Sequence, residues 1–114
     1  MGGGTGTGFG VGPEGLIPYA TWNLSMGKYF VGDVEKGLAK ALKGVGLNNG
    51  LFGGNKFRGK GIEVCLETYS GVMSRIKIDL YTDGDGRPED IQKAIQSEVD
   101  SQRTTLADSK FVKY

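Results

Sequence analysis

The sequence predicts an α+β fold, in which a small antiparallel sheet carries two helices on one face. Two observations support this prediction: a hairpin pattern in the second half of the chain, and an amphipathic helical pattern on each side of it. The chain has 114 residues, which is enough for one domain with its own hydrophobic core and too few for two. We therefore expect a single α+β domain over residues 16–114, preceded by an N-terminal arm.

Residues 61–81 hold the clearest pattern, because hydrophobic and polar side chains alternate on both sides of a break at Ser70 and Gly71. Side chains of a strand point alternately to its two faces, so this alternation predicts a β-hairpin with one apolar face. The apolar set is Ile62, Val64, Leu66, Ile76, Ile78 and Leu80, and the opposite set is Glu63, Cys65, Glu67, Arg75, Lys77 and Asp79. The alternation requires a loop with an odd number of residues, and residues 70–72 are the predicted turn.

The segment before the hairpin is predicted to hold one strand and one helix. Residues 16–26 are rich in side chains that prefer strands, which favours a first strand there. From Asp33 the hydrophobic residues recur at helical spacing as far as Gly44, which is typical of an amphipathic helix over residues 33–44. We expect Asp33 to cap the N-terminus of this helix.

After the hairpin, a second helix is predicted to run to about residue 102, with Asp83 or Asp85 as its cap and Pro88 in its first turn. Residues 110–114 are predicted to form a short final strand. The resulting βαββα(β) order matches the ferredoxin-like, or split βαβ, plan and also other small α+β sandwiches. In either plan, we expect the sheet face opposite the helices to be open to water or to a neighbour.

Most of the 21 glycines lie in two segments. Residues 1–15 form a glycine-rich arm with too little apolar surface to fold alone, so we expect it to become ordered on a neighbouring subunit. Residues 44–61 form a long glycine-rich loop, and long loops are often functional. The predicted oligomer contacts in these two segments are Phe9, Val11, Leu51 and Phe52.

The end of the long loop, residues 55–61, is basic and carries no acidic residue. Its cations can contact phosphates and its aromatic ring can stack on a base, or the same set can meet an acidic patch on a protein. The predicted binding residues are Lys56, Phe57, Arg58 and Lys60, to which Arg75 and Lys77 could add charge. An RNA-recognition motif is disfavoured, because the hairpin presents charged rather than aromatic outward positions.

Composition argues against most kinds of enzyme. The chain has no histidine and a single cysteine, Cys65, so the commonest general base and any multi-cysteine metal site are excluded. The glycines at 10, 12 and 15 lack the strand and helix that a nucleotide fingerprint requires, and the turn at residues 83–86 fits neither register of a calcium loop. We therefore predict no catalytic residue, no metal and no cofactor. An enzyme would have to use carboxylates such as Asp83, Asp85 and Glu89 with a metal ion.

The leading functional hypothesis is a non-enzymatic structural subunit that assembles with copies of itself, or with other assembly proteins, into a ring, tube or shell. Phage tail and head-completion components are examples of such proteins. The alternative is a nucleic-acid-binding module that uses residues 55–61. A net charge of +1 favours neither nucleic acid nor membrane as a general partner. With no apolar run of spanning length and no signal-peptide pattern, we expect a cytoplasmic or virion protein that does not contact membranes.

Overall fold

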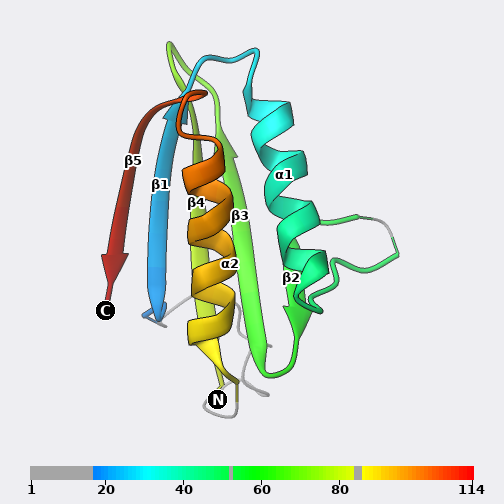
Figure 1. Cartoon of the computed structure of the whole chain (residues 1–114). Helices are drawn as coiled ribbons and strands as arrows, with labels where there is room; N and C mark the ends of the chain where they lie inside the picture. The colour runs from blue at the N-terminus through cyan, green and yellow to red at the C-terminus, as the bar shows by residue number, and fades with distance from the viewer. Residues whose placement is uncertain (1–16, 52, 84–85) are drawn as a thin grey trace.

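The computed structural model describes residues 17–51, 53–83 and 86–114, which form a five-stranded antiparallel sheet with two helices on one face (Figure 1). The predicted α+β class is therefore confirmed. In chain order the elements are β1 (Ala20–Met26), α1 (Val31–Gly44), β2 (Lys56–Gly59), β3 (Ile62–Tyr69), β4 (Ser74–Thr82), α2 (Pro88–Ser101) and β5 (Leu106–Lys113).

The order of strands across the sheet is β2-β3-β4-β1-β5, and every neighbouring pair is antiparallel. β4 lies between β1 and β3, and β1 lies between β4 and β5. The connection through α2, from β4 to β5, therefore skips β1, and the connection through α1, from β1 to β2, skips β4 and β3. β2 and β5 are the two edges of the sheet.

The hydrophobic core lies between the sheet and the two helices. All six aliphatic residues of the predicted hairpin face belong to it, which confirms the assigned faces. The helices contribute one buried stripe each: Val34, Leu38 and Leu42 from α1, and Ile91, Ile95 and Val99 from α2. This spacing of four residues is one that places side chains on the same face of an amphipathic helix.

The register of the hairpin differs from the predicted one. Leu66 pairs with Ile78 and Tyr69 with Arg75, so residues 70–74 separate the paired positions. The predicted turn at residues 70–72 was too short. Because the register moved by two residues, which is the period of a strand, each side chain kept its predicted face.

Both helix caps were predicted wrongly where the structure describes them. α1 begins at Val31 with Phe30 as its N-cap, and Asp33 lies in the first turn. A turn precedes this helix, with the Phe30 amide donating to the Gly27 carbonyl at 3.0 Å, so the chain already curves before Asp33. α2 has Arg87 as N-cap instead of Asp83, because Pro88 occupies the first helical position. Asp85 lies outside the described residues.

Two strands differ from prediction. β2 lies within the segment predicted as a loop, and its four residues, KFRG, include a single buried apolar side chain, Phe57. Such a short strand leaves almost no periodic signal in the sequence. β5 begins at Leu106, earlier than the predicted 110–114, because every residue after Leu106 is exposed and no alternation marks its start.

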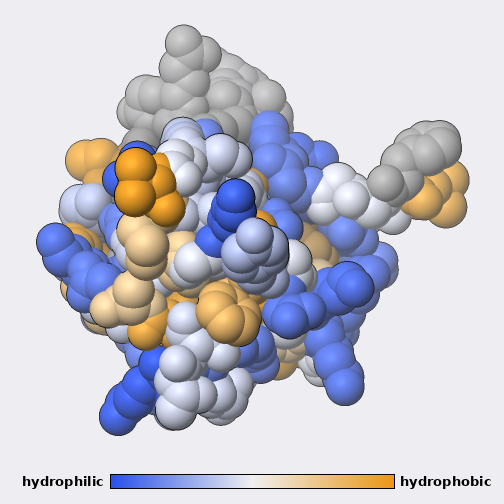
Figure 2. All heavy atoms as spheres, turned by 90° about the horizontal axis from the view of Figure 1, so that it is seen from above, coloured by the Kyte–Doolittle hydropathy of each residue, from blue (hydrophilic) through white to orange (hydrophobic). Residues whose placement is uncertain are grey.

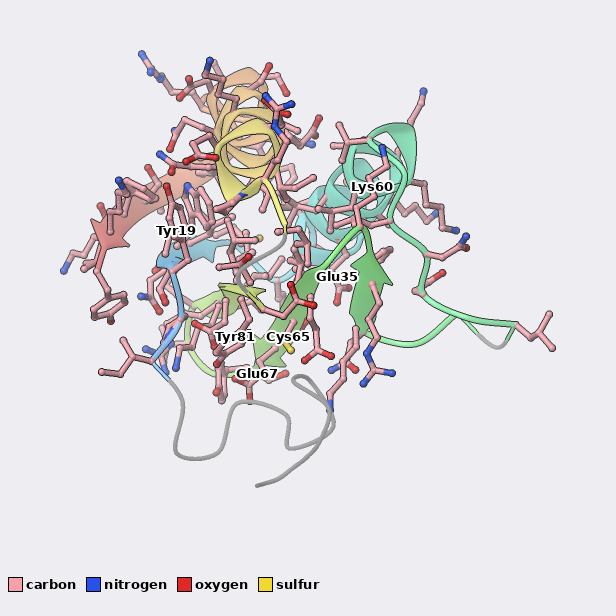
Figure 3. The ribbon with its side chains drawn as sticks, turned by 90° about the horizontal axis from the view of Figure 1, so that it is seen from below. Tyr19, Glu35, Lys60, Cys65, Glu67 and Tyr81 are labelled. Atoms are coloured by element: carbon pink, nitrogen blue, oxygen red, sulfur yellow. The ribbon has the colours of Figure 1, made fainter. Side chains whose placement is uncertain are left out.

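The sheet face opposite the helices is more closed than predicted. Glu63 was expected to face water, yet it is only 1% exposed, and Cys65, Asp79 and Tyr81 are buried as well. Figure 3 shows Cys65, Tyr81 and Glu67 on this side of the sheet. The polar groups have partners: the Thr21 hydroxyl donates to Asp79 Oδ1 at 2.7 Å, and the Cys65 thiol donates to Glu63 Oε2 at 3.4 Å.

One end of the molecule carries exposed hydrophobic side chains. They come from the connection between β1 and α1 and from the turn between β3 and β4: Tyr29, Phe30, Val72 and Met73. Seen from this end, hydrophobic atoms lie among charged ones (Figure 2). Neither helix of the described chain combines the length and the apolar character needed to cross a bilayer.

Candidate functional site

The β5 edge is the longest exposed edge of the sheet. All of its eight residues except Ala107, where the register shifts, pair with β1, and in the described chain no strand pairs with its other side (Figure 1). β5 is held to the body by Phe111, whose ring lies 4.9 Å from that of Trp22. Trp22 is buried and donates from Nε1 to Gln96 Oε1 of α2 at 2.9 Å.

The backbone orientation of β5 can be read from one hydrogen bond. The Tyr114 amide donates to the Tyr19 carbonyl at 3.1 Å, in the register that continues the β1–β5 pairing. Backbone groups of successive residues in an antiparallel strand point alternately to its two sides. Lys110 therefore faces β1 with its backbone groups, whereas the amides and carbonyls of Ser109 and Phe111 face away from the sheet. An unpaired edge of this kind is a template for another strand.

The β2 edge is short and partly covered. Asn48 and Arg58 exchange two backbone hydrogen bonds, of 2.9 and 2.8 Å, on the outer side of β2. Next to them, the Asn55 side chain donates to the Leu66 carbonyl at 2.9 Å, and the Leu66 amide donates to the Asn55 carbonyl at the same distance. These contacts occupy backbone groups that a further strand would need.

The predicted basic site is divided by the structure. Lys56 is exposed at the start of β2, whereas Phe57 is only 2% exposed and packs in the core, so its ring offers no face to a base. Arg58 Nε lies 2.6 Å from the buried Glu63 Oε1, which neutralises much of its charge. Lys60 lies in the β2–β3 turn and donates to the Val45 carbonyl at 3.4 Å. The three cations do not form one continuous patch.

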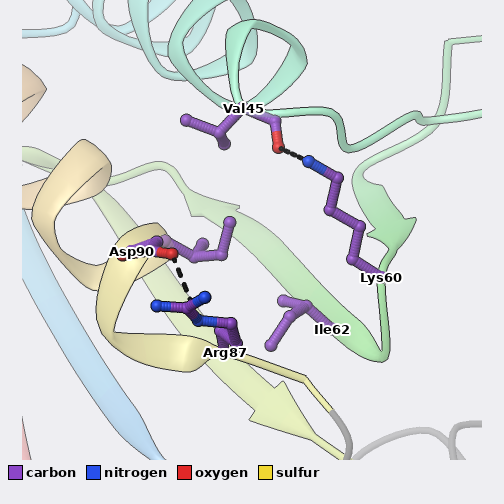
Figure 4. A pocket seen from close by; sticks show the side chains of 6 residues that line it. Val45, Lys60, Ile62, Arg87 and Asp90 are labelled. Atoms are coloured by element: carbon purple, nitrogen blue, oxygen red, sulfur yellow. Dashed lines mark hydrogen bonds and ion pairs between the residues drawn. The ribbon is translucent and has the colours of Figure 1, made fainter.

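A hollow of about 670 Å³ opens beside Lys60, where the end of α1, the β2–β3 turn and the start of α2 meet (Figure 4). Its lining combines apolar and charged side chains: Val45, Lys60, Ile62, Arg87, Asp90 and Ile91. Arg87 Nε and Asp90 Oδ2 lie 3.6 Å apart, both largely exposed. Sequence reasoning found Lys60 but neither Arg87 nor Asp90, because nothing in the sequence indicates that the β2–β3 turn meets α2.

The predicted oligomer contacts are only partly described. Leu51 is 98% exposed in the loop that projects from the body between α1 and β2. Phe9, Val11 and Phe52 lie outside the described residues. The β5 edge was missed as a contact, although a sequence signal exists in the oppositely charged pair that flanks Ser109, Asp108 and Lys110.

The remaining predicted residues lie apart from one another. Arg75 lies over the Tyr69 ring, 5.3 Å from its centroid, and Lys77 Nζ lies 3.8 Å from Asp79 Oδ2. Four aromatic residues lie close together in the sequence around β1: Trp22 is buried and Tyr19 packs against the core, whereas Tyr29 and Phe30 are exposed.

Cys65 lies in a setting that disfavours its thiolate. Burial, and then the neighbouring Glu63 carboxylate, raise the pKa of the Cys65 thiol to about 12. Burial and the nearby Asp79 also raise the pKa of the Tyr81 hydroxyl. Both groups are therefore protonated at neutral pH. Among the residues that the structure describes, no three His, Cys, Asp or Glu side chains are grouped so that they could hold a metal ion.

The sequence matches no protein-family model, and the search of curated proteins gives no significant match.

Proposed function

We propose that the chain is a non-enzymatic structural subunit that assembles with copies of itself, and that β5 is the contact. The observation that supports this most directly is the length and exposure of the β5 edge compared with the β2 edge. A strand added to an open edge gains a row of backbone hydrogen bonds without requiring a preformed pocket. A second copy of β5 is a suitable occupant because its side chains complement those of the first.

Charge selects one register for an antiparallel pair of β5 strands. The outward-facing backbone of Ser109 can exchange hydrogen bonds with the same residue of a second copy. In that register Asp108 of each copy lies opposite Lys110 of the other, which gives two favourable charge pairs. Shifting the register by two residues brings Lys110 opposite Lys110 or Asp108 opposite Asp108, so both neighbouring registers are disfavoured.

A two-fold axis perpendicular to the sheet relates two such strands. Two five-stranded sheets then become one continuous sheet with all helices on the same face. Growth of such dimers into a ring, tube or shell, as in phage tail or head-completion components, would use the predicted contacts Leu51, Phe52, Phe9 and Val11. For such a subunit we propose a cytoplasmic or virion location.

We also propose a ferredoxin-like plan for the domain, with β2 as an added edge strand. Without β2 the elements follow the order βαββαβ, and both connections through a helix skip one strand. This is the arrangement expected of a split βαβ unit repeated twice.

The test uses proline at two neighbouring positions of β5. Ser109→Pro should leave the monomer folded, because this amide faces away from β1, but it should weaken self-association at least about tenfold by removing intersubunit hydrogen bonds. Lys110→Pro is the matched control, since it removes an amide that pairs with β1 and should lower the melting temperature. Sedimentation velocity over a concentration series measures the association, and circular dichroism measures the fold.

Charge exchange then tests the register. Asp108→Lys and Lys110→Asp should each weaken the dimer, and the double variant should restore it, because it reverses both pairs together. A wild-type protein that stays monomeric at all concentrations would refute the assembly proposal. If Ser109→Pro leaves the association unchanged, the protein still assembles, but its contact lies in the loop or the arm and not at β5.

The nucleic-acid alternative has less support. Phe57 is in the core, and Arg58 is paired with Glu63, so Lys56 and Lys60 are the remaining free cations of the predicted set. The same protein preparation can be passed over immobilised single-stranded DNA at low salt. Retention that decreases steeply with added salt and is lost when Lys56 and Lys60 become glutamate would favour the alternative.

A further inference from the structure

Two glycines bring together the segments that form the hollow beside Lys60. A Cβ atom on Gly86 would lie 2.7 Å from the Gly61 carbonyl oxygen, and one on Gly61 would lie 2.9 Å from the Gly86 amide nitrogen. Any side chain at either position would therefore push the β2–β3 turn away from the chain that leads into α2. Because both residues are glycine, Lys60 and Arg87 lie on opposite sides of one opening (Figure 4).

The floor of the hollow is apolar and fixed. Ile62 and Ile91 are core residues, one on β3 and the other on the first turns of α2, and Val45 packs against the same core. An apolar floor of this kind can bury the hydrocarbon part of a ligand. Its volume of about 670 Å³ is within the range of small-molecule sites.

Among the described residues that line the hollow, two are cations and one is a carboxylate. In the described chain the Lys60 ammonium makes one long hydrogen bond, to the Val45 carbonyl, and no ion pair. An ammonium has three donors, so two of them remain for a ligand. The single carboxylate, Asp90, lies 3.6 Å from Arg87 in an exposed pair, and such a pair is weak enough for a ligand anion to compete with it.

Lys60 also occupies a backbone position that is unfavourable for lysine. Its φ is 55° and that of Gly61 is 74°, and positive φ at both central residues is typical of a two-residue type I′ turn. Asn and Gly adopt this conformation most easily, whereas lysine does so at a cost. A residue held in a strained conformation is a reason to look for a function of its side chain.

We propose that this hollow binds an organic anion with an apolar body, whose acidic group lies between Lys60 and Arg87 and whose hydrocarbon part rests on Ile62, Ile91 and Val45. The proposal does not depend on self-assembly. Neutral molecules of the same shape should bind more weakly, because they leave the Lys60 ammonium without an anionic partner. Inorganic phosphate should also bind more weakly, because it lacks the apolar part.

The probes are 4-phenylbutyrate, the neutral 4-phenylbutan-1-ol and inorganic phosphate, each titrated into the ¹⁵N-labelled full-length protein. We expect 4-phenylbutyrate to shift the amide signals of Lys60, Ile62 and Ile91 and to bind at least about tenfold more tightly than either control probe. Equal binding of the alcohol would overturn the proposal by removing the role of charge. Equal binding of phosphate would show a simple anion site and would overturn it too, as would no binding of 4-phenylbutyrate.

Substitutions separate binding from folding. Lys60→Asn should keep or raise the melting temperature, because Asn-Gly suits this turn, and yet weaken 4-phenylbutyrate binding at least about tenfold. Lys60→Arg should bind like the wild type, and Lys56→Asn, at the start of β2 and outside the hollow, is the control for net charge. If Lys60→Asn does not fold, Arg87→Gln on the opposite rim tests the same point. Unchanged affinity in both Lys60→Asn and Arg87→Gln would refute the site.

Discussion

The two edges of the sheet differ in how their backbone and side chains are occupied. At the β2 edge, which is four residues long, Asn48 bridges to Arg58, an aromatic side chain is in the core, and a cation is paired with a buried carboxylate. At the β5 edge, the seven residues after Leu106 are exposed, and the aromatic side chain is only partly covered. Proteins normally protect their open edges. The difference indicates that β2 completes the fold, whereas β5 is available for a partner.

The largest expected difference in the free energy of unfolding is between alanine substitutions of two phenylalanines, one on each edge strand. Phe57→Ala should lower the free energy of unfolding by about 4 kcal/mol, because it empties a fully buried site. Phe111→Ala, at a ring that is 40% exposed, should cost on the order of 1 kcal/mol. Urea unfolding followed by circular dichroism measures both values, at a protein concentration low enough to keep wild type and variants monomeric. Equal costs would mean that β5 belongs to the core as much as β2 does.

A smaller difference in the free energy of unfolding is expected between alanine substitutions of two cationic residues. Arg58→Ala should cost about 2 kcal/mol, because the Glu63 carboxylate, 1% exposed, loses its charged partner. Lys110→Ala, on the exposed β5 edge, should change the free energy of unfolding by less than about 0.5 kcal/mol. Urea unfolding under the same monomeric conditions is the measurement. The control is Arg58→Ala combined with Glu63→Gln, which removes the buried charge and should recover part of the loss. No recovery would mean that the cost of Arg58→Ala comes from lost packing of the arginine side chain and not from the charge pair.

The smallest effect is expected from pH. The pKa of the Cys65 thiol is raised from 9.0 to about 12 in the folded protein, first by burial and then by Glu63. Between these values the folded state binds more protons than the unfolded state, so stability is full below pH 9 and decreases as the pH rises toward 12. We expect a loss of about 1 kcal/mol near pH 10. Tyr81 adds to this loss in the same direction. Urea unfolding at increasing pH measures it.

The matched control removes the thiol from β3, the neighbour of β2, and places one on the edge strand β5. Cys65→Ala combined with Lys110→Cys should reduce the loss of stability at alkaline pH. The new thiol should react rapidly with Ellman's reagent at pH 8, at which the wild-type thiol reacts slowly. Equal reaction rates of the two thiols would contradict the interpretation that position 110 is accessible to solvent whereas position 65 is not.

The features that the sequence predicted well are the periodic ones. Alternation placed every aliphatic residue of β3 and β4 on the correct face, and helical spacing located α1 and α2, because burial of one face imposes these periods. The hairpin turn was predicted two residues too short without consequence for the faces, since pattern alone does not distinguish registers that differ by one strand period. Positions set by tertiary packing, such as the helix caps and β2, were missed.

The candidate sites were much harder to predict. Lys56, Phe57, Arg58 and Lys60 look like one basic group in the sequence, but alternation along β2 sends Phe57 into the core and leaves Arg58 beside Glu63. Lys60 meets Arg87 only because Gly61 and Gly86 allow two distant segments to touch. Neither the pairing of Arg58 with Glu63 nor the approach of Lys60 to Arg87 can be recognised from neighbouring residues in the sequence.

The packing of Trp22 gives the protein an internal optical reporter. It is the only tryptophan, it is buried, and it contacts Phe111 of β5 and Gln96 of α2. Indole emission depends on solvent and on nearby quenchers. Fraying of β5 alone would therefore expose one side of the indole and shift its emission to longer wavelength while the helical signal stayed unchanged. Fluorescence of the unmodified chain can thus follow the edge strand separately from the rest of the fold.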